Sequence, residues 1–467
     1  KYPTNNLLIV ISAMGKITNK LEELTWAYVK GSDSAHKIFE EIKNFHFEIL
    51  NELFEDHNNP IFDEVANTFV EIEWLLEEEA SDGAGYLYDQ IVSIGELVST
   101  KIVAAYLNLS GTFTIWTDAR NYIKTDNNYR EANVIWDKTE HEIQKHLPSF
   151  LEKGIVVTQG FIGADENNFT TTLGREGSDY TAAIFAYCLG AEMVNELSLV
   201  SRTGFFDVEA RAPWLEAIEL VGGGKDFLAK LVVAGEVIGR VNQSAPENLR
   251  GAIITIAGHD HFTAAFYSGA INEGTLFDSM GTAEALLRTF KTSLPREAIA
   301  ELAAANVGLS CSVIPDHYTL LGALPTGLTL ERVCALVGVK TRAEKIALGE
   351  AALKVDSSTN TLQIVNNYHG LSVTNLDEGA SPAALFRAAT EHLVRDSEQM
   401  VSLIEKFTGK SKEVIIAGGW IKNPMIASQK SKQFGEYKVS DAQEAGATGA
   451  AQFAGIAAGI ISLPNLK

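Results

Sequence analysis

A glycine-rich run in the first half of the chain has the chemistry of an anion-binding loop. It reads Gly174-Arg175-Glu176-Gly177-Ser178-Asp179. Glycines let the backbone approach a ligand closely, and the free amides of a following helical turn point toward negative charge. Arg175 can bind a carboxylate through two parallel hydrogen bonds. A plain turn closed by a capping aspartate is the structural alternative, and the string by itself leaves both open.

A second candidate is a carboxylate that follows a predicted buried strand, Ala252–Ala257. The strand runs into Gly258-His259-Asp260-His261, and α/β proteins place their chemistry at the carboxyl ends of strands. Asp260 could accept a proton from an attacking hydroxyl, the general-base role in phosphoryl transfer to an alcohol. A lone aspartate after a strand is more often a cap or an ion-pair partner. The two flanking histidines have no cysteine or further histidine cluster to complete a metal site, so none is predicted.

Two glycine sites in the second half have the chemistry of nucleotide binding. Ser279-Met280-Gly281-Thr282 predicts a tight turn whose amides and hydroxyl would wrap phosphate oxygens. Gly418 and Gly419 follow the predicted strand Val414–Ala417, and bare backbone there would let a nucleotide lie against the chain. Each site is weak alone, so their order along the chain carries the prediction.

The elements that must position these residues alternate between strands and helices, which predicts an α/β architecture in both halves. Asp179 is expected to cap a helix over 180–189. In the first half we expect buried strands at 7–12 and 155–160 and helices at about 21–28, 35–56 and 63–79. In the second half we expect strands near 275–278, 285–290 and 414–417 and helices at about 295–305, 382–406 and 446–463.

Length and composition indicate a globular chain of more than one domain. The 467 residues exceed the size at which single cores stop growing, and 46% are hydrophobic. No apolar run predicts a membrane span, and no secretory signal is visible. The net charge of −22 argues against binding to nucleic acid or to anionic membranes.

The acidic charge is concentrated in the first half. Residues 1–194 hold 14 Lys and Arg against 31 Asp and Glu, and the remainder holds 24 against 29. Such asymmetry indicates two regions of different origin. The cysteines Cys188, Cys311 and Cys334 lie in apolar contexts. Three buried thiols without a disulfide framework fit a reducing, cytoplasmic location.

Residues 5–194 resemble the catalytic domain of aspartate kinases, of the amino-acid kinase family. The matching segments are Val10–Asn19, Ser93–Thr100, Asp118–Arg120 and Thr170–Ala183. The resemblance implies that four residues hold the substrate L-aspartate: Thr18, Glu96, Arg175 and Ser178. Glu96 would meet its ammonium group and Arg175 a carboxylate. Three further residues would lie near the phosphoryl path: Ser12, Gly15 and Asp179.

The first half departs from that family in two ways. The family's opening strand, whose lysine stabilises the transferring phosphate, is not found. The strand and loop that bind nucleotide after the helix are also missing, because the chain continues instead into Asn195-Glu196-Leu197-Ser198. The family's regulatory domains are not found either. This half therefore reads as a substrate pocket without most of its ATP site.

Residues 195–467 resemble the C-terminal part of FGGY-family carbohydrate kinases, of the actin-like ATPase superfamily. The matching segments are Ser201–Asp207, Ala257–His261, Asp278–Glu284, Ala417–Gly419 and Gly446–Ala450. The resemblance implies Asp260 as the base that activates a sugar hydroxyl. It places Gly281 and Thr282 at the ATP phosphates, Gly418 and Gly419 at the adenosine, and Mg²⁺ between phosphate oxygens. The family's opening hairpin with Asp-x-Gly-Thr and most of its sugar site are not found.

The sequence therefore predicts a partial amino-acid-kinase-like α/β/α sheet over 1–194, followed by an actin-like, ribonuclease-H-like ATPase lobe. Residues 195–255 would end an FGGY kinase's first domain, and 256–467 would form its nucleotide-binding domain. The expected activity is ATP-dependent phosphoryl transfer to a sugar or to L-aspartate, and the sequence allows a homo-oligomer. The alternative is a catalytically silent composite, engineered or mis-assembled, that keeps ligand pockets without turnover. One site shared by both parts would need reacting atoms about 3–3.5 Å apart across their interface, which we do not expect.

Overall fold

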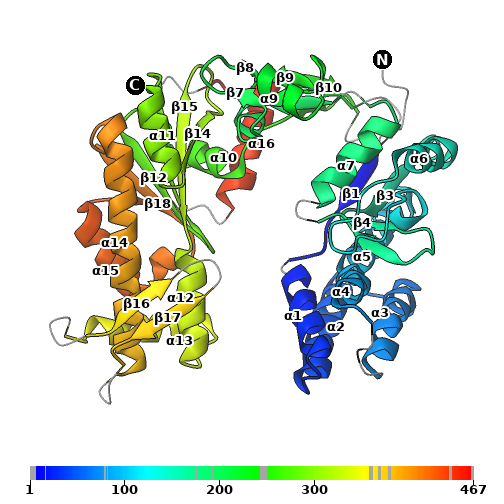
Figure 1. Ribbon diagram of the computed structural model, residues 1–467, viewed down its shortest axis with the longest axis horizontal. Coiled ribbons are helices and arrows are strands. Elements are labelled where there is room, and N and C mark those ends of the chain that lie inside the picture. Colours follow the sequence, from blue (N-terminus) through cyan, green and yellow to red (C-terminus); the bar gives the residue numbers. More distant parts are fainter. Residues whose placement is uncertain are drawn as a thin grey trace. The chain divides into compact units, whose positions relative to one another are not determined.

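The computed structural model describes residues 7–15, 17–77, 80, 82–174, 177–191, 193–241, 250–356, 361–366, 370–376, 380–440 and 444–463. The chain forms two compact units (Figure 1). The first contains Lys1–Met193 and Val241–Ala252, and the second contains Val194–Arg240 and Ile253–Lys467.

The first unit is a small parallel sheet covered by helices. Its elements are β1 (Leu8–Ile11), α1 (Ile17–Val29), α2 (Ser34–Leu53), α3 (Ile61–Glu77), α4 (Ala84–Val92), α5 (Ile94–Leu109), β2 (Thr114–Trp116), η1 (Ala119–Asn121), α6 (Trp136–Leu151), β3 (Ile155–Gln159), β4 (Ile162–Ala164), β5 (Thr170–Thr172) and α7 (Gly177–Cys188). The sheet has the order β1-β3-β2, with Leu8 beside Val156 and Thr114 beside Ile155. β4 and β5 form a separate antiparallel hairpin.

Hydrophobic side chains divide this unit into two cores. One core joins α6 and α7 to one face of the sheet through Ile143, Ile184, Phe185 and Val156. The other is built by the helices α1 to α5, in which one apolar stripe of each amphipathic helix is buried. Phe39 and Phe69 meet there edge to face, with ring centroids 5.9 Å apart. The packing fixes the end of β1 and the starts of α1, α5 and α7.

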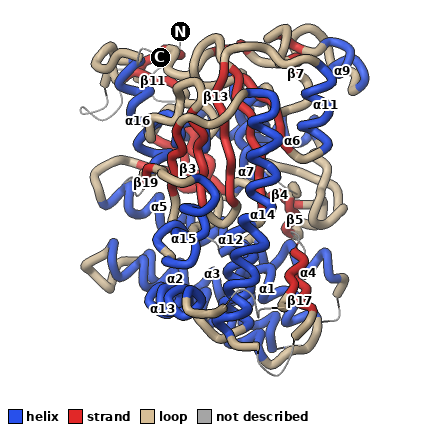
Figure 2. The backbone as a smooth tube through the Cα atoms, turned by 90° about the vertical axis from the view of Figure 1, so that its left-hand side faces the viewer, coloured by secondary structure: helices blue, strands red, loops and turns tan. Residues whose placement is uncertain are grey.

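The second unit is built on a six-stranded mixed sheet of order β14-β15-β13-β12-β18-β19, part of which Figure 2 shows in red beside α14. Its elements are β6 (Val194–Glu196), α8 (Leu197–Val200), β7 (Phe206–Asp207), β8 (Ala212–Pro213), α9 (Leu215–Leu220), β9 (Lys230–Val232), β10 (Val237–Arg240), β11 (Ile253–Thr255), α10 (Asp260–Tyr267), β12 (Thr275–Met280), β13 (Glu284–Phe290), α11 (Arg296–Ala304), β14 (Val307–Cys311), β15 (Tyr318–Leu324), α12 (Thr326–Leu336), α13 (Arg342–Leu353), β16 (Gln363–Asn366), β17 (Leu371–Thr374), α14 (Pro382–Thr408), β18 (Glu413–Ala417), η3 (Trp420–Lys422), α15 (Pro424–Phe434), β19 (Lys438–Val439) and α16 (Ala445–Ala457).

Alternate residues of the central strands point into cores on opposite faces of this sheet. Leu276 and Leu286 pack with α11, α12, α14 and α15 on one face. Phe277 and Leu287 pack with α10 and α16 on the other. This alternation is the period of a strand that is buried on both faces. β12 and β18 run parallel, so their carboxyl ends meet at one edge of the sheet.

The α/β architecture predicted for both halves is confirmed, and three local expectations need correction. β1 is only half-buried because it lies at the edge of its sheet. β11 is shorter than predicted and half-exposed, because it pairs only with β10. α7 begins at Gly177, so Asp179 lies in its first turn and is not its cap. The three cysteines are buried free thiols, as predicted.

One helical stretch, Ala84–Leu109, is long and apolar enough to cross a membrane by length and composition alone. It comprises α4 and α5, and 67% of its most apolar window is buried inside the protein.

Candidate functional site

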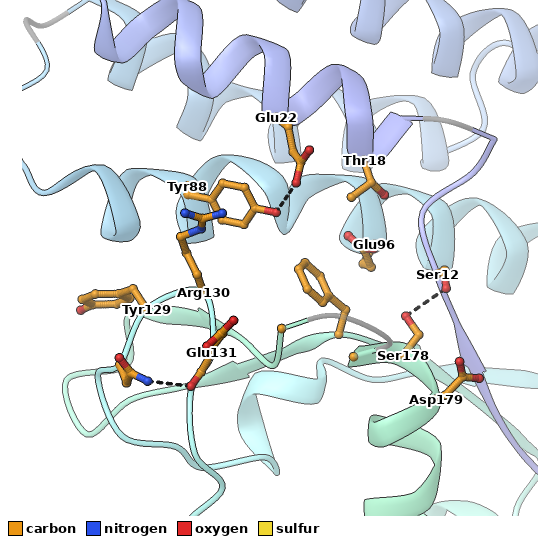
Figure 3. Close-up of a pocket in the computed structure, with 14 residues that line it drawn as sticks. Ser12, Thr18, Glu22, Tyr88, Glu96, Tyr129, Arg130, Glu131, Ser178 and Asp179 are labelled. Carbon is orange, nitrogen blue, oxygen red and sulfur yellow. Dashed lines mark hydrogen bonds between the residues drawn. The ribbon is translucent and has the colours of Figure 1, made fainter. Parts of the chain in front are cut away.

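A cavity of about 750 Å³ opens in the first unit where β1, α1, α5 and α7 converge (Figure 3). Five residues predicted from the sequence line it: Ser12, Thr18, Glu96, Ser178 and Asp179. Gly15 lies in the turn between β1 and α1, where its φ of +57° favours glycine, but it does not line the cavity. Arg175 lies outside the described residues. The roles of these residues in binding stay predictions.

Glu96 is the most constrained group of this cavity. It lies in the first turn of α5 and is only 2% exposed. Its Oε1 accepts a hydrogen bond from the Ala13 amide at 3.3 Å, while its Oε2 has no partner in the described part of the chain. Burial raises the pKa of Glu96 to about 8. The carboxyl group therefore holds a proton at neutral pH unless a cation enters beside it.

Close packing places Glu96 next to the loop after β1. A Cβ atom on the preceding residue, Gly95, would lie 2.9 Å from the Ala13 Cβ and 3.0 Å from Leu21. Glycine thus lets α5 approach this loop closely enough for the Ala13 amide to reach the carboxylate. The motif Ser93–Thr100 is therefore required by geometry as well as by charge.

Two hydroxyl groups from distant parts of the sequence meet beside Glu96. The Ser12 Oγ donates to the Ser178 Oγ at 2.9 Å, which joins the end of β1 to the start of α7 (Figure 3). The Ser99 hydroxyl donates to the Ser12 carbonyl at 2.8 Å. Thr18 faces the same space from α1, and Asp179 is exposed at its rim. The cavity therefore combines one buried carboxyl with several hydroxyl groups and with less buried carboxyl groups such as that of Asp179.

The residues that form the opposite wall of this cavity were not predicted from the sequence. Tyr88 on α4 donates its hydroxyl to Glu22 Oε1 at 2.6 Å, and the Arg130 guanidinium lies 4.7 Å from the Tyr88 ring centroid (Figure 3). Glu22 could have been inferred, because it lies four residues after Thr18 on the same face of α1. Arg130 lies in an irregular loop that one sequence does not place.

A buried aspartate holds that loop in position. Asp89 accepts hydrogen bonds from the Arg130 amide and from the amide and hydroxyl of Thr172, at 2.7–3.1 Å. Burial raises the pKa of Asp89 to about 6, although these donors oppose the rise. Arg130 has a φ of +76°, an uncommon conformation that these contacts hold in place.

In the second unit, Asp260 is the first residue of α10 and lies in solvent. Its side chain is 81% exposed, and its Oδ1 lies 3.1 Å from His259 Nδ1 and accepts from the His261 amide at 2.7 Å. Burial lowers the pKa of His259 to about 4, so that ring is neutral at physiological pH. A general base needs reach to a substrate hydroxyl, and the exposed position of Asp260 provides access.

The loop that carries Asp260 is anchored by residues that the sequence did not reveal. The His259 amide donates to Ser198 Oγ at 2.9 Å, and Ser198 in turn donates to the buried Glu196. A Cβ atom on Gly258, whose φ is +90°, would lie 2.6 Å from the Ser198 hydroxyl. Burial raises the pKa of Glu196, although Ser198 and Leu199 donate to it. Residues directly after Met193 thus position the candidate base.

The phosphate turn and the glycine pair lie side by side. Ser279 pairs with Ala417, so Gly281 and Gly418 follow adjacent parallel strands. A Cβ atom on Gly418, at a φ of +104°, would lie only 2.3 Å from the Met280 carbonyl. Gly281, Thr282, Gly418 and Gly419 are all exposed, although the Gly281 amide already donates to the Ala283 carbonyl at 3.0 Å. The role of this edge as a phosphate cradle stays a prediction.

No group of three or more His, Cys, Asp or Glu in the described part of the chain is arranged to hold a metal ion.

Comparison with known proteins shows a sequence similarity that is confined mainly to the first half of the chain. Residues 2–202 match the amino acid kinase family. The lysine-sensitive aspartokinase 3 of Escherichia coli K12 is 36% identical over 192 residues, which are 41% of this chain and 42% of that protein. The chloroplastic aspartokinase 1 of Arabidopsis thaliana is 32% identical over 277 residues, 54% of this chain and 47% of that protein. The chain spans less than half the length of either relative.

Solved structures show a second likeness, which concerns the fold. A ligand-bound xylulose kinase from Lactobacillus acidophilus superposes with a TM-score of 0.53 at 14% identity, covering 72% of this chain and 83% of that one. A xylulose kinase from Rhodospirillum rubrum superposes with a TM-score of 0.51 at 15% identity, covering 71% of this chain and 65% of that one. The first part of the chain is thus similar in sequence to aspartokinases, and the chain is similar in fold to carbohydrate kinases.

The buried Glu96 carboxyl should make the first unit less stable as pH rises. Its pKa rises from 4.5 unfolded to about 8 folded, so between these values the folded state binds more protons than the unfolded state. The free energy of unfolding therefore falls with rising pH in this window. We expect Glu96→Gln to melt about 5 °C above the parent protein at pH 8.5 and to match it near pH 4.5 in calorimetry. The melting temperature of the exposed control Glu23→Gln should equal that of the parent protein at every pH. If burial of the charged Glu96 carboxylate cost no free energy, Glu96→Gln would also melt with the parent protein at every pH.

Gly418 and Gly419 should differ sharply in their tolerance of a side chain. Gly418→Ala places a methyl group against the Met280 carbonyl at a positive φ and should lower the free energy of unfolding of the second unit by about 1–3 kcal/mol. The methyl group of Gly419→Ala would project into open space at a φ of −75°, so this change should alter the free energy of unfolding by about 0.5 kcal/mol or less. Urea unfolding would measure both values. Equal losses in the two variants would contradict the close packing of β12 and β18 at this edge.

Proposed function

We propose that this chain is an ATP-dependent phosphotransferase composed of two parts. Residues 1–194 would be an aspartate-kinase-like α/β/α segment that binds L-aspartate. Residues 195–255 would end the first domain of an FGGY-type carbohydrate kinase, and 256–467 would form its actin-like ATPase lobe. The proposal is supported by the family match of residues 2–202 and by the fold likeness to a xylulose kinase, which covers 72% of the chain. The observation that carries the proposal is the buried, half-satisfied Glu96 in a cavity lined by hydroxyl groups.

L-Aspartate complements this cavity in charge and in hydrogen bonding. Its ammonium group would pair with Glu96 Oε2, which has no described partner, and so offset the cost of burying the carboxylate. The hydroxyl groups of Thr18 and Ser178 would donate hydrogen bonds to a substrate carboxylate, and Arg175 would add a bidentate contact. Ser12, Gly15 and Asp179 would lie near the path of the phosphoryl group.

The edge formed by β12 and β18 would bind ATP. The turn at Gly281 and Thr282 would hold the phosphates, and Gly418 and Gly419 would leave room for the adenosine. Mg²⁺ would bridge phosphate oxygens. Asp260 would accept the proton of a sugar hydroxyl during transfer. Three buried free thiols support a reducing, cytoplasmic location for this activity.

A second candidate is a composite that binds ligands without turnover. Its support is that α7 is followed along the chain by β6 of the second unit, and the described residues of the first unit form no further strand after that helix. Asp260 is also 81% exposed, and excluded water is normally part of phosphoryl transfer.

L-Aspartate should bind to the full chain through Glu96. Titration calorimetry should detect binding, and Glu96→Gln should weaken it roughly 10- to 100-fold, because a charge-assisted contact is lost. Glu23→Gln, an exposed change on α1, should leave the affinity unchanged. A ligand that lacks the ammonium group, such as malate, should bind the parent protein as weakly as L-aspartate binds Glu96→Gln. Undetectable aspartate binding by the folded parent protein would refute the substrate assignment.

ATP consumption should separate the two candidate functions. An active phosphotransferase should release ADP faster with at least one sugar or with L-aspartate than with ATP alone. Asp260→Asn should reduce the sugar-dependent rate roughly 10²- to 10⁴-fold, since it removes a general base. Glu209→Gln, an exposed carboxylate of the same unit, serves as the control. Binding of aspartate and ADP without any rise above the ATP-only rate would establish the silent composite.

A further inference from the structure

A fully buried ion cluster lies directly behind the proposed nucleotide-binding edge. Its centre is the Lys430 ammonium on α15, which has no exposed side-chain area. The Nζ atom lies 2.7 Å from Asp278 Oδ2 and 2.6 Å from Glu284 Oε1, and both carboxylates are buried as well. Burial opposes the charge on Lys430, but the two carboxylates outweigh it and raise the pKa of the lysine.

The position of the two carboxylates in the sequence gives the cluster its significance. Asp278 and Glu284 stand on either side of the turn that contains Gly281 and Thr282, one on β12 and the other on β13. A single lysine that contacts both therefore closes the base of this turn. The contact with Glu284 is an aligned hydrogen bond, whereas the contact with Asp278 is an ion pair without that alignment.

Further contacts connect the cluster to the helices around the turn. The Thr326 hydroxyl, at the start of α12, donates to Glu284 Oε2 at 2.6 Å. Ser397 on α14 donates to Glu284 Oε1 at 2.7 Å and accepts from Lys430 at 3.1 Å. The Leu328 amide of α12 donates to the Thr282 carbonyl at 2.8 Å, so the same helix also holds the tip of the turn.

The lysine also connects the turn to the glycine pair. α15 begins at Pro424, a few residues after Gly418 and Gly419, with only η3 between them. A shift of α15 relative to β12 and β13 would therefore move the adenosine and phosphate contacts apart. Figure 1 shows α14 and α15 packed beside β12 and β18 in this part of the second unit.

We infer that Lys430 is a positioning residue that locks the phosphate turn and the glycine pair into one rigid nucleotide-binding edge. It acts through Asp278 and Glu284 and does not touch the nucleotide itself. The inference rests on the proposed nucleotide-binding function of this edge. Desolvating three charged groups costs free energy that an apolar cluster would avoid. A buried charged cluster can nevertheless be retained because it fixes the geometry of the elements around it.

The test is ADP affinity of the full chain, measured by calorimetry with Mg²⁺, beside thermal unfolding without nucleotide. Lys430→Met alone leaves two carboxylates unpaired and is expected to destabilise the unit. The decisive variant is therefore the uncharged triple change Asp278→Asn, Glu284→Gln and Lys430→Met, which keeps side-chain size. Ser397→Ala is a milder second variant. Lys432→Met, an exposed lysine on the same helix, is the matched control.

We expect the triple variant to unfold near the parent temperature and to bind ADP about tenfold more weakly, since members of one polar network are energetically coupled. Ser397→Ala should weaken ADP binding in the same direction, and Lys432→Met should not change it. L-Aspartate affinity should stay at the parent value in all of them. Parent-like ADP affinity in both the triple variant and Ser397→Ala would overturn the positioning role and leave the proposed function intact. Failure of the parent protein to bind ADP would overturn both.

Discussion

A carboxylate removed from water must find a cation, a hydrogen-bond donor or a proton, and both units are organised around carboxylates in that position. Asp89 is satisfied by three donors, one from the loop of Arg130 and two from Thr172 on β5, so it fixes the shape of the first cavity. Glu284 accepts hydrogen bonds from a lysine and two hydroxyl groups, so it fixes the turn beside it. Glu96 differs from both, because one of its oxygens is buried without a partner among the described residues. The unsatisfied group is the one that is suited to a ligand.

Glycine supplies the second constraint, because these contacts require backbones to approach one another more closely than a Cβ atom allows. At Gly95 the approach brings a loop amide to Glu96, and at Gly258 it brings Ser198 to the loop of Asp260. At Gly418 it brings two parallel strands together and leaves bare backbone at their ends. At Gly95 and Gly258 the glycine is useful without contacting a ligand. It allows a polar side chain nearby to be held in a defined place.

The sequence predicted the elements better than the contacts between them. Continuous apolar runs and helical periodicity located β3, β12, β18 and α14, because these patterns report burial directly. The same patterns misjudged β1 and β11, since apolar composition does not tell a central strand from an edge strand. Thr18, Glu96 and Ser178 were found through motifs, and the cavity brings them together. Arg130, Glu196 and Lys430 were missed, because their importance depends on partners at least 40 residues away or on a loop conformation that local sequence does not encode.

The two units meet the same electrostatic constraint in opposite ways, and this difference has a functional consequence. In the second unit the cation that neutralises Glu284 belongs to the chain, so the proposed nucleotide edge would be complete before any ligand arrives. In the first unit Glu96 has no described cation beside it, so its charged form depends on a group brought by a ligand. A preformed edge loses little conformational freedom on binding and is selective for shape. A carboxyl group without a cation is selective for charge, because a neutral ligand would not offset the free-energy cost of burying the carboxylate. Under the proposed function, recognition in the first unit would rest on the ammonium group, whereas recognition in the second would rest on the rigid placement of the turn and the glycine pair.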